Sequence, residues 1–168
     1  MLTILVKLFK ALNSEQSPGQ LAGAVSLAAI IGVTPLLSLH NVLVILLVLW
    51  FRVNLTMFIV AWPLFTVLGL ILSQPAESIG LTILQAQSLV PMWESFYNTV
   101  VGRWSNFYHA GVIGSLVIAL GLAIVLFPIS NRAVSLYRDK WLEKVEQYRI
   151  VKLLKASKFW QVYQSLSN

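Results

Sequence analysis

The amino-acid sequence predicts an all-α protein that is integral to a membrane. Hydrophobic residues make up 58% of its 168 residues and charged residues only 11%, whereas an ordinary soluble domain has about 25% charged residues. The mean hydropathy is +0.79. Uncharged stretches alternate with prolines and short polar turns. So apolar a chain cannot cover its own surface with polar side chains, which excludes a monomeric soluble globule and intrinsic disorder.

The first residues predict a helix that lies on the membrane. Residues 1–12 are apolar apart from Lys7 and Lys10. A cleavable signal peptide would place its basic residues before the apolar core, and here they follow apolar residues. We therefore expect a short amphipathic helix in the membrane interface. Ser17 and Pro18 then predict the N-cap and first residue of a new helix.

Residues 20–52 predict a helical hairpin. Residues 16–51 carry no charge, and Pro35 interrupts them. The apolar pieces 20–33 and 42–51 are each shorter than the roughly 20 residues that cross a bilayer core. The hairpin therefore either enters the membrane and turns back inside it, or crosses it twice as thin spans. The sequence leaves both alternatives open.

Two further segments predict membrane spans, at about 55–73 and 110–130. The first contains Pro63, where we expect a kink. The second is uncharged, and we expect it to end at Pro128 and Arg132. Residues 75–108 between them are less hydrophobic and rich in aromatics, and from Pro91 their apolar residues follow one face of a helix. Tryptophan and tyrosine favour the headgroup level, so we expect this segment to lie along the interface.

The basic residues divide the chain into a membrane domain, 1–131, and a cytoplasmic amphipathic helical tail, 132–168. Most Lys and Arg residues lie in this tail, namely Arg132, Arg138, Lys140, Lys144, Arg149, Lys152, Lys155 and Lys158. Because cytoplasmic segments carry an excess of Lys and Arg, both termini are predicted to be cytoplasmic in a multi-pass protein of the plasma membrane. Interspersed acids and an apolar stripe favour a membrane surface over nucleic acid as the partner of the tail.

The turn of the hairpin is the best candidate for a ligand site. It places several polar residues between two apolar helices, and the residues concerned are Thr34, Pro35, Ser38, His40 and Asn41. Irregular backbone at membrane depth must be satisfied by protein or by a water-filled cavity, and broken helices of this kind form transporter binding sites. The alternative is a turn at the far surface, where His40 or Asn41 caps the next helix.

Two other groups of residues are candidates for binding or packing. Arg52 with Asn54 can bind a lipid phosphate through the guanidinium donors, and the alternative is an anchor that only sets topology. Gly19, Gly23 and Gly32 share the four-residue spacing that lets helices approach closely. They serve either packing within the chain's own bundle or contact with a partner helix.

The sequence gives no indication of an enzyme. The absence of cysteine excludes disulfides, thiolate metal sites and cysteine nucleophiles. The HExxH, GxSxG and phosphate-loop motifs are absent as well. We therefore expect no catalytic residue, no metal and no cofactor.

Three stretches of the chain resemble a known family. They are Ser17-Pro18-Gly19-Gln20, then Gly32-x-Thr34-Pro35-Leu36-Leu37-Ser38-Leu39-His40-Asn41, and then Arg52-Val53-Asn54-Leu55. They resemble the bacterial inner-membrane proteins that carry domain of unknown function 2062, in a proteobacterial subgroup with "TPLLSLHN". The resemblance implies inner-membrane location. It also implies a partner, because genes of the subgroup tend to lie beside one for a large AsmA-like bridge protein implicated in phospholipid transport.

Taken together, these observations predict a non-enzymatic inner-membrane component of envelope lipid transport. It would anchor the AsmA-like partner or feed lipid to it, and membrane phospholipids would be its ligands. The alternative is a self-contained small transporter or flippase, possibly a homo-oligomer, that uses the Pro35 turn as its substrate site. A structural scaffold without a transported ligand is a third hypothesis.

Overall fold

A computed structural model describes residues 16–141 of the chain, and within that range the fold is helical with no strand. The expected interfacial helix at residues 1–12 and most of the basic tail lie outside these residues. The elements in chain order are α2 (Pro18–Val33), α3 (Leu39–Trp50), α4 (Leu55–Ile71), α5 (Ser73–Leu84), the 3₁₀ turn η1 (Gln87–Leu89), α6 (Val90–Tyr97), α7 (Val100–Trp104), α8 (Ala110–Leu136) and the π-helical turn η2 (Tyr137–Trp141).

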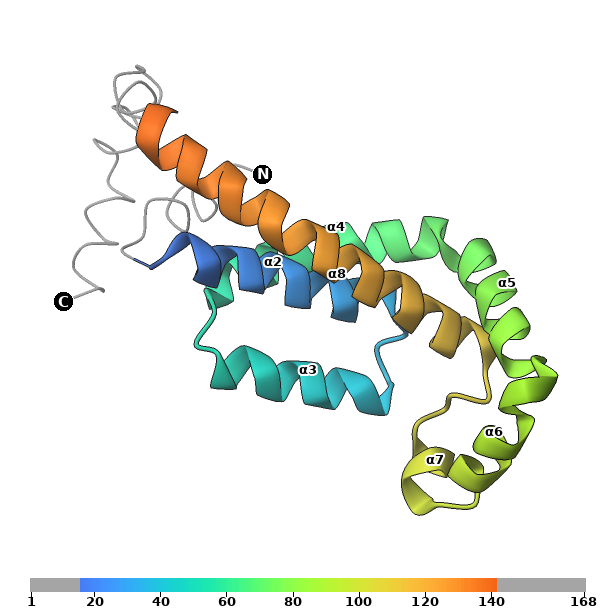
Figure 1. The fold of residues 1–168 in the computed structure, drawn as a ribbon. Coiled ribbons are helices and arrows are strands. Elements are labelled where there is room, and N and C mark those ends of the chain that lie inside the picture. Colours follow the sequence, from blue (N-terminus) through green and yellow to red (C-terminus); the bar gives the residue numbers. More distant parts are fainter. Residues whose placement is uncertain (1–15, 142–168) are drawn as a thin grey trace.

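Helix α2 is the central helix of the bundle. Ser17 caps it as predicted: its hydroxyl accepts from the Gln20 N–H at 3.3 Å, while the Gln20 side chain accepts from the Ser17 N–H at 3.0 Å. This reciprocal capping box, with Pro18 at the first helical position, fixes the start of the helix. Most of α2 is buried, because α4 and α8 both pack along it (Figure 1).

The residues of the predicted hairpin form two helices, α2 and α3, joined by a turn at residues 34–38. Helix α3 lies on the outside of the bundle (Figure 1). It buries His40, Asn41, Val44 and Val48. The rest of α3 is exposed and largely apolar.

The sharp bend near the first predicted span lies at Leu72, not at Pro63. Helix α4 runs through Pro63 to Ile71, and α5 leaves it at 68°. Pro75 explains the position of the bend, because it has no N–H to donate to the Ile71 carbonyl and its ring clashes with that carbonyl. The Ser73 hydroxyl donates to the Leu70 carbonyl at 2.8 Å, next to the bend.

Residues 75–108 do not form a single interfacial segment as expected. Their first part belongs to α5, which packs against α8. Close contact is possible because Gly80 lies against the Ala110 backbone and Gly114 lies against the Ala76 backbone, with no room for a Cβ at either glycine. Each helix thus contributes two small residues four positions apart, which are Ala76 and Gly80 of α5 and Ala110 and Gly114 of α8.

The aromatic helix expected from Pro91 is two short helices. Helix α6 ends at Tyr97, and α7 begins after Thr99, whose hydroxyl accepts from the Gly102 N–H at 3.0 Å. This threonine N-cap makes the break. Gly102 lies against the Phe96 backbone, so the two short helices fold onto each other.

Helix α8 is longer than the predicted span 110–130. It continues through Pro128 and Arg132 to Leu136, so the expectation that it ends at those two residues is wrong. Among the described residues, it is the one helix that is long and apolar enough by itself to cross a membrane. Helices α4 and α5 pass the same test together as a bent pair, which allows up to two such spans.

The bundle has two distinct ends (Figure 1). At one end, which we call the basic end, Leu21 packs on Val134 and the Arg138 guanidinium donates to the Gln16 carbonyl at 2.7 Å. At the other end, which we call the turn end, Thr34 of the hairpin turn meets the start of α5 and the start of α8. Helices α2 and α8 therefore run side by side in opposite directions.

Candidate functional site

The hairpin turn is closed by its own polar side chains. The Asn41 amide donates to the carbonyls of Pro35 at 2.9 Å and Leu36 at 3.2 Å, and the Ser38 hydroxyl also donates to the Pro35 carbonyl at 2.8 Å. The Thr34 hydroxyl lies 3.0 Å from the Asn41 side-chain oxygen. Asn41 thus reaches back from the first turn of α3 rather than capping it. The irregular backbone is satisfied internally, as an apolar surrounding requires.

His40 faces away from these hydrogen bonds. Its side chain is 8% exposed, and neither ring nitrogen has a hydrogen-bond partner among the described residues. The ring stacks on Phe107 at 6.0 Å between centroids, and Phe107 stacks on Phe96 at 6.0 Å. Phe96 in turn contacts Tyr97, whose pKa is raised by burial of the phenol. His40 therefore joins α3 to the aromatic residues of the turn end.

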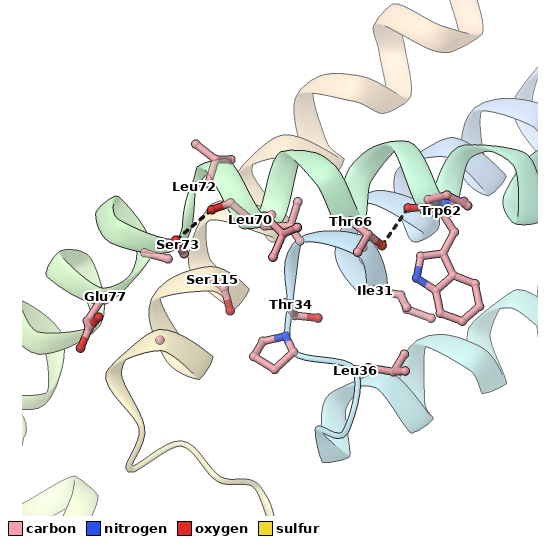
Figure 2. A pocket seen from close by; sticks show the side chains of 17 residues that line it. Ile31, Thr34, Leu36, Trp62, Thr66, Leu70, Leu72, Ser73, Glu77 and Ser115 are labelled. Carbon is pink, nitrogen blue, oxygen red and sulfur yellow. Dashed lines mark hydrogen bonds between the residues drawn. The ribbon is translucent and has the colours of Figure 1, made fainter.

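A pocket of about 780 Å³ lies beside the turn, between α2, α4, α5 and α8 (Figure 2). Thr34, Pro35 and Leu36 form one wall of it, and Trp62 and Leu70 of α4 form another. Most of its lining is apolar. The polar side chains that line it are Thr34, Thr66, Ser73, Glu77 and Ser115.

The hydroxyl groups of this pocket all donate to carbonyls in or beside their own helices. The bonds are Thr34 to Ile30 at 2.8 Å, Thr66 to Trp62 at 3.2 Å, Ser73 to Leu70 at 2.8 Å and Ser115 to Val112 at 3.0 Å. Each hydroxyl has only one hydrogen, so its oxygen remains available to the pocket as an acceptor. The pocket can therefore surround an apolar group and accept hydrogen bonds at a few places.

Arg52 and Asn54 lie at the basic end, away from the turn. They line a second, smaller pocket of about 370 Å³ together with Gln16. Asn54 is buried and caps α4, since its side chain accepts from the Met57 N–H at 2.7 Å. Arg52 is exposed with a φ of 49°, a conformation that costs a non-glycine residue about 1 kcal/mol or more. The structure therefore divides the predicted ligand residues between two sites.

The three predicted packing glycines have different surroundings. A Cβ at Gly32 would lie 2.5 Å from the Phe65 Cβ, so this glycine permits close contact between α2 and α4. A Cβ at Gly23 would lie 3.2 Å from Val53, whereas one at Gly19 would meet only the Ser17 hydroxyl, at 3.8 Å. Gly32 thus serves packing within the chain's own bundle.

Four polar residues of the large pocket were not predicted from the sequence. Thr66, Ser73 and Ser115 have no local signal, because hydroxyls that bond to their own helix are common in apolar helices. Glu77 does have a signal in the sequence, because it is the only acidic residue between Glu15 and Glu94. Within the described residues, no group of three His, Cys, Asp or Glu side chains could hold a metal ion.

Comparison with known proteins places the chain in a family. No curated protein and no solved structure matches it. One family model, however, matches residues 4–142, which include the hairpin, the bent pair and all of α8. The chain therefore belongs to the bacterial family described as "Uncharacterized protein conserved in bacteria (DUF2062)".

Proposed function

We propose that this protein is a non-enzymatic inner-membrane component of bacterial envelope lipid transport, and that it holds a phospholipid in the pocket at the hairpin turn. The observation that carries the proposal is this pocket. Its volume of about 780 Å³, its apolar walls and its few acceptor groups suit the acyl and glycerol part of a lipid. Thr34 and Pro35, the predicted turn residues that line it, would contact the lipid directly.

The exposure of the apolar helices supports placement in a membrane. Only 28% of the most apolar 18-residue stretch of α8 is buried inside the bundle, whereas the core helix of a soluble protein is mostly buried. Large apolar side chains such as Leu64, Leu70 and Ile124 are about 70% exposed or more. Monomeric soluble proteins rarely expose contiguous apolar surface on this scale.

The distribution of arginines supports an orientation. Arg52, Arg132 and Arg138 lie at the basic end, and the rest of the basic tail follows them in sequence. Because cytoplasmic segments carry an excess of basic residues, this distribution supports a cytoplasmic position for the basic end. The turn end and its pocket would then lie at the periplasmic side, from which lipid departs for the outer membrane.

We also propose a protein partner for the turn end. Similarity to the "TPLLSLHN" subgroup implies an AsmA-like bridge protein, which would receive lipid at the turn end. The alternative, a self-contained transporter or flippase, would use the same pocket, because Pro35 lines it. Reconstitution into liposomes distinguishes these two hypotheses. A transporter moves lipid by itself, whereas a bridge component moves lipid only when its partner is present.

Two glycines of α8 provide a matched test of the pocket. A Cβ at either Gly111 or Gly121 meets no atom within 4 Å, but only Gly111 lines the pocket. Gly111→Leu should fill the pocket without disturbing the bundle, and Gly121→Leu is its control. By native mass spectrometry in mild detergent, we expect Gly111→Leu to lower phospholipid retention by about tenfold or more, equivalent to about 1.4 kcal/mol.

The same variants test transport in cells that depend on this gene. Pulse-labelled phospholipid should reach the outer membrane more slowly with Gly111→Leu, and at the normal rate with Gly121→Leu. If Gly111→Leu retains phospholipid as the unchanged protein does, the pocket is not the lipid site and the proposal fails.

A further inference from the structure

We infer that the pocket selects a phospholipid whose headgroup carries a primary ammonium, such as phosphatidylethanolamine. This inference rests on the proposed function, because it names the lipid that the same pocket would hold. It follows from the hydrogen-bonding groups of the pocket, from its charge and from the position of Glu77 opposite Trp62.

The pocket offers acceptors rather than donors. The hydroxyls of Thr34, Thr66, Ser73 and Ser115 use their hydrogens on backbone carbonyls. Trp62 is the only residue among those that line the pocket with a side-chain N–H. The phosphate, which every phospholipid carries, needs donors that the pocket lacks, so it must stay hydrated, and the terminal headgroup decides the selectivity. An ammonium group has three N–H donors and needs acceptors, which this pocket supplies.

The charge of the pocket favours the same ligand. Glu77 is the only charged residue among those that line it; it is exposed, and it has no ion pair with residues 16–141. No Lys, Arg or His is present in the lining. The carboxylate attracts a cationic headgroup, and it repels one that carries only negative charge.

The arrangement of the side chains orients the lipid. Figure 2 shows Glu77, Ser73 and Ser115 on one side of the pocket, with Leu72 beside Ser73. Trp62, Ile31 and Leu36 lie on the other side, with Thr66 beside Trp62. The ammonium would lie near α5 and donate to the carboxylate and hydroxyl oxygens there. The acyl chains would extend along α4 toward Trp62. Thr34 lies between the two sides, at the middle of the pocket.

A competition experiment tests this selectivity. The purified protein is equilibrated in mixed micelles with equal amounts of phosphatidylethanolamine and phosphatidylglycerol, and the bound lipids are identified by native mass spectrometry. We expect about a tenfold preference for phosphatidylethanolamine, equivalent to about 1.4 kcal/mol. Glu77→Gln should reduce the ratio to about one, and Glu77→Lys should reverse it. Glu94→Gln is the matched control, because Glu94 is an exposed acid of α6 that does not line the pocket.

Two further ligands separate the contributions of charge, hydrogen bonding and lipid. Phosphatidylcholine keeps the positive charge but has no N–H, so it should bind less well than phosphatidylethanolamine. Soluble ethanolamine at the same concentration should displace no lipid, because it lacks the acyl chains. Displacement of the lipid by ethanolamine would overturn the assignment of a lipid ligand.

Equal binding of the two phospholipids, or a preference that Glu77→Gln leaves unchanged, would overturn the inference. The proposed function would survive that result if Gly111→Leu still loses both lipids. If Gly111→Leu loses neither, the proposed function itself fails. The two failures are therefore distinguishable within one set of samples.

Discussion

His40 and Thr34 occupy the same turn but have different surroundings. The Thr34 hydroxyl is hydrogen-bonded and lines the large pocket, whereas the His40 imidazole stacks on Phe107 and lines neither that pocket nor the one beside Arg52. A buried imidazole without a hydrogen bond is unfavourable by about 1–3 kcal/mol. The ring therefore stabilises the turn end through its shape and its aromatic contact rather than through its nitrogens.

We predict that phenylalanine replaces His40 without loss of stability. His40→Phe keeps the stacking on Phe107 and removes the unbonded nitrogens, so the free energy of unfolding should stay the same or rise by about 1 kcal/mol. His40→Ala removes the ring and should lower it by about 2–3 kcal/mol. Unfolding in detergent, followed by circular dichroism, measures both. If His40→Phe is as destabilising as His40→Ala, the imidazole nitrogens stabilise the turn end and the stacking alone does not.

His109 is the control for this prediction. It is the only other histidine of the chain, it is exposed, and its ring contacts the neighbouring Tyr108. His109→Phe should therefore change the free energy of unfolding by less than about 0.5 kcal/mol.

Single residues of the turn could be predicted from the sequence, but the pocket could not. Thr34, Pro35, Ser38, His40 and Asn41 stood out because polar residues beside a proline interrupt an uncharged stretch. The other walls of the pocket come from helices 30 to 80 positions further along the chain, such as Thr66 and Ser115. No local pattern shows that helices so distant in sequence pack beside the turn.

At the scale of the helices, prolines had different effects that depended on their position. Pro63 and Pro128 lie inside α4 and α8, and both helices continue through them. Pro75 lies shortly after the end of α4, where Ser73 supports a break with its hydroxyl. Apolar helices tolerate proline because neighbouring groups re-satisfy the freed backbone, so a proline alone does not predict a bend.

The contact between α5 and α8 depends on glycine. We predict that Gly114→Leu lowers the free energy of unfolding by about 2–3 kcal/mol or more, because its side chain would meet the backbone of α5 at Ala76. Unfolding in detergent measures the loss.

Gly121→Leu is the matched control, since a Cβ at Gly121 meets no atom within 4 Å in the same helix. It should be neutral or stabilising by up to about 1 kcal/mol, because glycine disfavours helix interiors. Equal losses in Gly114→Leu and Gly121→Leu would contradict the contact between α5 and α8.

For the whole molecule, composition was sufficient to predict the helical fold and the hairpin, but not how the helices pack. Uncharged stretches located α2, α3, α4 and α8, because apolar helices need no polar face. The same uniformity removes the amphipathic pattern that would show which side of each helix faces its neighbours. The central place of α2, which small residues such as Ala24 and Ala28 allow, appears only in the folded bundle.

The proposal that the pocket lies at the periplasmic side, and Arg52, Arg132 and Arg138 at the cytoplasmic side, requires the hairpin to cross the membrane beside α8. Single cysteines test it cleanly, because the chain has none of its own. Leu37, 89% exposed in the turn, and Ala133, exposed near the basic end, are suitable positions.

In intact cells, a maleimide that cannot cross the inner membrane should label Leu37→Cys. It should label Ala133→Cys only after that membrane is permeabilised. Labelling of both cysteines from the same side, or protection of Leu37→Cys under both conditions, would contradict the crossing hairpin and the periplasmic position of the pocket.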